Sequence, residues 1–166
     1  MRSAATAGWA FLLWGDDAAG PVPHTPLTAR LAAATHTARA LRTLRKRGWG
    51  VAQSHLRELQ LPQGAHRDLP EATAIRLARR ELPRCQLVVR LLDPDALCLS
   101  RSFALAVHLS ALGLPAETVI ARQRSSIGAR FAFHSWTELH GEVLNDVPAV
   151  QSGHTVLHRV RCAALV

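Results

Sequence analysis

The order of secondary-structure signals along the chain predicts an α+β fold, with helices first and an antiparallel sheet after them. Helical periodicity dominates up to residue 82, and segment 98–113, which is apolar nearly all round, has the character of a buried central helix. Three strand-like segments follow, at 117–122, 130–139 and 142–146. With 166 residues, 48% of them hydrophobic, the chain is long enough to form one domain with its own core.

Two amphipathic helices are expected before the buried one. The first follows the break PVPHTP (21–26), with Thr25 as its cap and Pro26 in its first turn, and it ends at Gly48. Its expected apolar stripe is Leu27, Leu31, Ala34, Ala38 and Leu41. After the loop 60–67, the second helix is expected to begin at Asp68, with Ala72, Ile75, Ala78 and Leu82 on its apolar side. Pro83 is expected to stop it, and segment 84–92 fits either a helix or a strand.

The first residues resemble a signal peptide only in part. The apolar run 4–14 is too short to span a bilayer, and Asp16 and Asp17 lie where a cleavage site needs small neutral residues. We therefore expect residues 1–24 to dock on a single domain that covers 25–166. The three cysteines include no close pair, which argues against a disulfide framework and favours a cytoplasmic location without membrane contact.

The strong positive charge does not by itself indicate a nucleic-acid partner. The net charge is +8, but the arginines are spread from Arg2 to Arg161, whereas a nucleic-acid binder gathers its charge into a patch. Four Trp, four Phe and no Tyr offer few rings for base stacking. A solvated basic surface, or an acidic partner or substrate, explains the charge better. No CxxC or HExxH motif is present, so neither a metal nor a cofactor is expected.

Three residues in the second half form a candidate catalytic triad: Cys98, His134 and Asp146. Cys98 opens the buried helix, where free N–H groups and the helix dipole favour the thiolate that a cysteine nucleophile must form. His134 lies on a predicted strand and can act as its base, and Asp146 ends the next strand and can orient that histidine. Each residue alone also fits a structural role: a small core residue, a half-buried histidine and a strand-end carboxylate. Their order along the chain favours the triad.

The other cysteines lack such a setting. Neither Cys85 nor Cys162 follows a break that opens a strong helix, so both are expected to be structural. The remaining histidines also have weaker cases, and His154 is expected near the surface.

The hairpin register provides a geometric expectation. If His134 directly faces Asp146 on antiparallel strands, the loop is Leu139–His140–Gly141 and Glu138 lies opposite Glu142. Gly141 then occupies the left-handed position that ends a three-residue loop. We expect His134 and Asp146 on the face that the Cys98 helix covers, with the sulfur within about 4 Å of the ring.

The motifs CLSRSFALAVHLSALG and FAFHSWTELHGEVLND carry a family resemblance. Over residues 70–160 the chain resembles the transglutaminase-like leader peptidase of lasso-peptide biosynthesis, the C-terminal half of what some clusters encode as one fused B protein. The resemblance implies a papain-like fold, with Cys98 as nucleophile, His134 as general base and acid, and Asp146 as its orienter. Trp136 matches the motif tryptophan, and Ser135 replaces the usual alanine between His and Trp.

The resemblance also implies partners. The substrate would be a ribosomally made precursor peptide, and no ATP site of the GxxxxGK[ST] type is present. Fused relatives carry a preceding leader-binding module, whereas the residues before the second helix here have a helical pattern. A separate leader-recognition protein is therefore expected, and the ATP-using lasso cyclase is a further candidate partner. The alternatives are an acyltransferase of the transglutaminase or arylamine acetyltransferase type, a non-catalytic peptide-binding module and a nucleic-acid binder.

Overall fold

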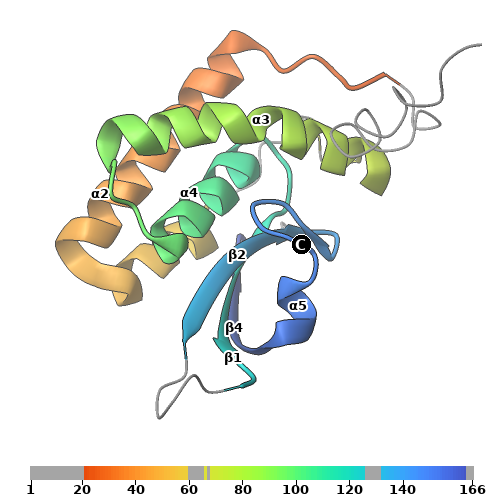
Figure 1. Cartoon of the computed structure of the whole chain (residues 1–166). Coiled ribbons are helices and arrows are strands. Elements are labelled where there is room, and N and C mark those ends of the chain that lie inside the picture. Colours follow the sequence, from red (N-terminus) through yellow and green to blue (C-terminus); the bar gives the residue numbers. More distant parts are fainter. Residues whose placement is uncertain (1–20, 60–65, 67, 126–131, 164–166) are drawn as a thin grey trace, which may run out of the picture.

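The computed structural model describes residues 21–59, 66, 68–125 and 132–163. Within them the chain has four helices and one antiparallel sheet, which confirms the predicted α+β class (Figure 1). The helices are α2 (Leu27–Glu58), α3 (Glu71–Leu92), α4 (Cys98–Ala111) and α5 (Val150–Gly153). The strands are β1 (Glu117–Gln123), β2 (Phe133–Leu139), β3 (Glu142–Val143) and β4 (His154–Arg161). None of the described helices has the length and apolarity that crossing a membrane requires.

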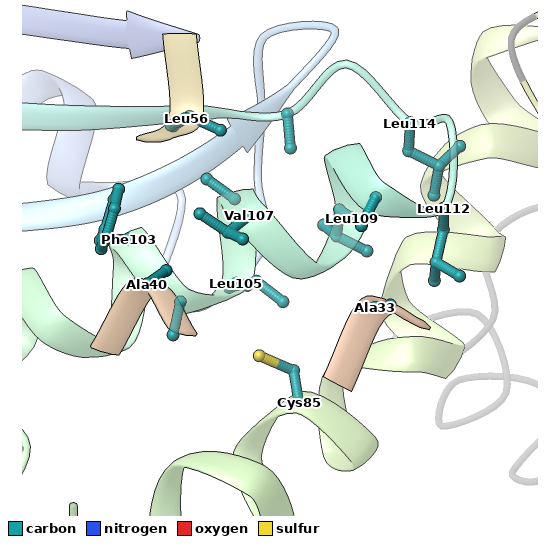
Figure 2. Packing of buried hydrophobic residues seen from close by; sticks show 14 of the residues in the cluster. Ala33, Ala40, Leu56, Cys85, Phe103, Leu105, Val107, Leu109, Leu112 and Leu114 are labelled. Carbon is teal, nitrogen blue, oxygen red and sulfur yellow. The ribbon is translucent and has the colours of Figure 1, made fainter. Parts of the chain in front are cut away.

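Helix α4 lies at the centre of the core, as its composition predicted. Every residue from Ser102 to Ala111 is buried, and the helix contacts α2, α3, β1 and β2. Figure 2 shows Phe103 and Leu105 of α4 among core side chains from the surrounding helices. Gly113, with φ 88°, ends the helix in the left-handed conformation that glycine adopts without strain. This burial fixes the position of Cys98, the first residue of the helix.

Helix α2 is two helical segments joined at a kink. Gly48 has φ 75° and ψ 179°, so it interrupts the helix as predicted, but a second segment continues to Glu58. Thr25 is not the cap: the N-cap is Pro26, and the Thr25 side chain is buried, 3.5 Å from His66.

The predicted apolar stripe of α2 is partly wrong. Leu27 and Leu31 are 68% and 60% exposed, and small residues at neighbouring positions face the core instead. The buried residues of α2 are Ala33, Thr37, Ala40, Leu41, Ala52 and Leu56. Alanine and threonine let α2 approach α4 closely, and the sequence pattern, which weighted leucine, missed this. The predicted docking of residues 1–24 concerns mainly residues 1–20, outside the described part.

Two glycines near the kink should respond to alanine in opposite directions. Gly48→Ala should lower the free energy of unfolding by about 1–3 kcal/mol, because its backbone region is essentially reserved for glycine. Gly50→Ala, inside the second helical segment, should raise it by about 0.5–1 kcal/mol through helix propensity. A Cβ at either position meets nothing within 4 Å, so packing does not blur the comparison. Urea unfolding measures both values, and equal effects would contradict the backbone argument.

Helix α3 continues through Pro83, so the expectation that this proline ends the helix is wrong. Proline inside a helix costs about 3 kcal/mol through a lost hydrogen bond and a steric clash. Beyond it, Cys85 and Val89 are buried in the core, and burying one aliphatic side chain returns about 1.5–3 kcal/mol. The ambiguous segment 84–92 is therefore helical because its burial offsets the proline.

The sheet has the order β3-β2-β1-β4, antiparallel throughout. β1 and β2 match their predicted segments closely within the described residues, whereas β3 is much shorter than the predicted 142–146. Strand β4 was not predicted. Seven of its eight residues are at least partly exposed on an edge strand, so its sequence lacks a clear apolar alternation.

The predicted hairpin register is wrong by one residue. Leu139 pairs with Glu142, which leaves the two-residue loop His140–Gly141 in place of the three-residue loop. Both loop residues have positive φ, 52° and 80°, as a type I′ turn requires, and this turn fits the twist of the strands best. The observed register places Glu138 opposite Val143, which avoids the like-charge pair with Glu142.

Candidate active site

The structure brings His134 and Asp146 together. The Nε2 atom of His134 lies 2.5 Å from Oδ2 of Asp146, and both side chains are part-buried. The second oxygen, Oδ1, accepts a hydrogen bond of 2.7 Å from the backbone N–H of Val147. With Nε2 donating to the carboxylate, Nδ1 is the nitrogen left to accept a proton. This is the pairing that the sequence predicted, although the chain reaches it differently.

Asp146 lies beyond β3, because the chain bends after Leu144. The N–H of Leu144 still donates to Thr137 (3.0 Å), and the next ladder position is filled by the side chain of Asn145, whose Oδ1 accepts from the N–H of Thr137 at 2.7 Å. Direct pairing in the observed register would place Asp146 opposite Ser135. The bend lets Asp146 reach His134 instead, so the expectation of adjacent paired strands is corrected.

Ser102 attaches the first turns of α4 to β2. Its hydroxyl lies 2.8 Å from the carbonyl of Cys98 and 2.9 Å from that of Ser135, and its own carbonyl accepts from the Thr137 hydroxyl at 2.9 Å. The Nδ2 group of Asn145 donates to the Ser102 hydroxyl at 3.1 Å. Ser102 is fully buried, so this network holds the helix against the strand at a fixed position.

The direction of these contacts indicates where Cys98 lies. Ser102 contacts Thr137 through its carbonyl, toward the end of α4, and Ser135 through its hydroxyl, toward the start of α4. The start of the helix therefore points along β2 toward His134, and Cys98 is about 6 Å before Ser102 along the axis. Within the described residues, no hydrogen bond joins the Cys98 thiol to His134, and the expected thiol–imidazole contact stays a prediction.

The expected face of the sheet is corrected. Thr137 and Leu139 face α4, as shown by the Thr137 bond to Ser102 and by Leu139 in the main core. Side chains alternate along a strand, so His134 shares the opposite face with Trp136, whose indole packs in the smaller second core. Residues of β2 before Glu138 have no β3 partner, and at Thr137 the edge of β2 is bonded to Leu144 and the Asn145 side chain instead.

The family model of the transglutaminase-like superfamily matches residues 28–159. The chain belongs to this superfamily. Members are typically Cys-His-Asp enzymes with hydrolase or transferase activity. No match was found among curated proteins or among solved structures. This chain has a cysteine at a helix start, then a histidine on a strand and then an aspartate after the next strand. That order fits the Cys-His-Asp residues typical of the superfamily.

In this transglutaminase-like domain, Asp146 has the charge that an orienting carboxylate needs. Burial alone would raise its pKa, but hydrogen bonds from His134 and the Val147 amide, with the charges of His134 and His154, hold the pKa below its ordinary value. The carboxylate is therefore ionised at neutral pH and can stabilise a protonated His134. No set of three or more His, Cys, Asp or Glu side chains in the described ranges could hold a metal ion.

His154 is a neighbour of the site that the sequence did not reveal. Its ring lies 5.5 Å from that of His134 and 5.8 Å from the Trp136 indole, and Nδ1 lies 2.9 Å from the carbonyl of Val150. It comes from the start of β4, the strand that was not predicted. Trp136 is anchored in turn by its Nε1, which donates to Glu138 at 2.6 Å. These rings pack against one side of His134.

Three exposed hydrophobic residues adjoin the candidate residues along the chain, Leu97, Phe133 and Val147, and together they are called the apolar rim. Each is a chain neighbour of one of them, and they are 77%, 67% and 63% exposed. Exposed large hydrophobic side chains are common singly, but several around one site indicate a surface that contacts another molecule.

The three cysteines should differ sharply in reactivity. Iodoacetamide at pH 7 should alkylate Cys98, which is part-exposed at an uncapped helix start, and leave Cys85 and Cys162 unmodified. Cys85 is buried, and burial raises its pKa to about 12; Cys162 is only 4% exposed. Peptide mapping by mass spectrometry measures the extent of labelling at each site. Labelling of Cys85 as fast as Cys98 in the folded protein would contradict this assignment.

Proposed function

We propose that the protein is a cysteine peptidase that removes the leader from a ribosomally made lasso-peptide precursor. The observation that carries the proposal is the His134–Asp146 hydrogen bond, beside the helix that Cys98 opens. The superfamily supports Cys-His-Asp chemistry, and the resemblance of the motifs around these residues to the lasso leader peptidase supports the substrate.

The proposed reaction has two steps. The Cys98 thiolate attacks the carbonyl at the leader–core junction; the C–S bond forms, the C–N bond breaks, and His134 gives its proton to the departing amine. The leader is then held as a thioester. Water attacks this thioester with His134 as base, which frees the leader carboxylate and restores the thiol. Asp146 stabilises the imidazolium throughout.

Backbone amides at the start of α4 are the candidate oxyanion donors. Leu97, the N-cap, provides no side-chain cap, and the first turn contains no acidic residue that would compete for these N–H groups. The amides of Cys98 and Leu99 are therefore free to donate to the oxygen that becomes negative in the tetrahedral intermediate.

An acyltransferase of the transglutaminase or arylamine acetyltransferase type is the second candidate, because it would use the same three residues with an amine as acceptor. The two differ in their product. A peptidase yields a free leader acid, whereas a transferase yields an amide when an amine such as putrescine is supplied.

Leader removal should depend on a separate leader-recognition protein. Incubation with a precursor peptide should give slow cleavage, and adding the recognition protein should raise kcat/KM at least tenfold by positioning the leader. The net charge of +8 is suited to an acidic leader or partner. Mass spectrometry identifies the cut site, and a scrambled leader is the control. Equal rates with and without the partner, well below saturation, would exclude this dependence; no cleavage under either condition would exclude the function.

A further inference from the structure

A pocket of about 160 Å³ lies beside the candidate active site, between the C-terminal half of α3 and the first turns of α4. Its apolar wall includes Leu82, Val89 and Leu105, and its rim includes Arg101 and Asn145. The volume is well below the roughly 300–1,000 Å³ of sites for cofactors or drug-sized ligands. It is suited to a single side chain of a larger ligand.

The pocket is connected to the proposed chemistry on two sides. Arg101 lies three residues after Cys98, a spacing that places both on one face of α4 with Cβ atoms about 5–6 Å apart. Asn145 immediately precedes Asp146 and donates to Ser102, the residue that attaches α4 to β2. An extended peptide advances about 3.3 Å per residue, so a chain with its carbonyl at Cys98 reaches the pocket within about two residues.

The lining indicates what the pocket binds. Cys85 on its wall is an uncharged thiol, since burial raises its pKa to about 12, and with Leu82, Val89 and Leu105 it forms the apolar part of a lining that also contains polar side chains. At the rim, Arg90 and Arg101 outnumber the one carboxylate, Asp93. Neither arginine has an ion pair with a described acidic residue, so both guanidinium groups can receive a negative group from a ligand. The exposed apolar rim at the nearby site also favours an apolar peptide.

We propose that this pocket binds an apolar side chain of the peptide substrate, within two residues of the scissile bond, and that Arg101 pairs with an acidic residue next to it. The proposal rests on the proposed peptidase function and specifies its substrate. Leucine-sized side chains fill the pocket, while the acidic neighbour stays at the solvent-exposed rim.

Short peptides test the pocket without any catalysis. The full-length Cys98→Ala protein, labelled with ¹⁵N, is titrated with acetyl-Gly-Leu-Glu-Gly-amide and with versions carrying Ser for Leu or Gln for Glu. The Leu-Glu peptide should shift the amide signals of Leu82, Val89 and Asn145 and bind at least threefold more tightly than either substituted version. Shifts confined to other regions, or equal affinities for the three peptides, would overturn the proposal.

Two variants separate the apolar and charged parts. Gln86→Trp, at an exposed position on the pocket margin, should fill the pocket and weaken binding at least fivefold. Leu87→Trp, next along the same helix, 58% exposed and outside the pocket, should bind like the parent. Arg101→Gln should lose the preference for Glu over Gln while keeping that for Leu over Ser. Unchanged binding in both Gln86→Trp and Arg101→Gln would exclude this pocket.

The peptide-binding experiment and the precursor-cleavage experiment can fail separately. If wild-type protein does not cleave precursor but the Leu-Glu peptide binds in the pocket as described, the peptidase function fails and the pocket stands. If precursor is cleaved while the peptides leave the pocket signals unmoved, the pocket assignment fails and the function stands.

Discussion

Cys98→Ala should lower kcat for precursor cleavage by about 10⁴-fold or more, because no other group can form the thioester on which the proposed mechanism depends. The substitution removes one sulfur atom from a part-exposed position at the start of α4. The Ser102 contacts that fix this helix use the backbone carbonyl of Cys98 and survive the change. The thermal midpoint should therefore shift by no more than about 2 °C, which corresponds to about 0.5–1 kcal/mol.

The matched control for this variant is Cys162→Ala, which removes a thiol directly after the end of β4. Cys162 is buried, so this variant should lose some stability while the folded fraction keeps the parental kcat. Cleavage is followed by mass spectrometry under single-turnover conditions. Release of leader by Cys98→Ala at the wild-type rate would show that the mechanism is wrong.

The fold class could be predicted from the sequence because the strongest patterns coincide with the deepest burial. Segment 98–113 is apolar nearly all round, and it forms the most buried helix, α4. Elements with weaker patterns were missed for identifiable reasons. Strand β4 is largely exposed, so its sequence shows no alternation, and Pro83 stays helical because burial farther along α3 offsets its cost.

The contact between His134 and Asp146 was predicted from the sequence, but the path by which the chain makes it was not. A histidine and an aspartate twelve residues apart across a turn suggested direct pairing, and the structure reaches the same contact through a tighter turn followed by a bend at Asn145. A two-residue type I′ turn was preferred because His140 tolerates positive φ. The supporting residue Ser102 was within the quoted motif, but its role depends on tertiary contacts that no periodicity encodes.

His134→Ala should be almost as damaging as loss of the nucleophile, with kcat for precursor cleavage lowered by about 10²–10⁴-fold, the range for loss of a general acid–base group. The variant removes both the base that forms the thiolate and the acid that protonates the departing amine. Asp146→Asn should be milder, near the lower end of that range. Its amide oxygen can still accept from Nε2 of His134, but it lacks the charge that stabilises the imidazolium, and it can turn to donate and select the wrong tautomer.

Two exposed residues supply matched controls, His24→Ala and Asp95→Asn, and both should keep the parental rate. Single-turnover cleavage rates of each variant are measured across pH 5–9. Circular dichroism at each pH reports whether the variant remains folded, so a lost rate in a folded variant reflects the chemistry and not stability. The order of effects is the critical result. If Asp146→Asn were as active as the parent while His134→Ala was inactive, the carboxylate contact would be structural and the catalytic unit would be a Cys98–His134 dyad. If His134→Ala stayed within about threefold of the parent, His134 would not be the acid–base group.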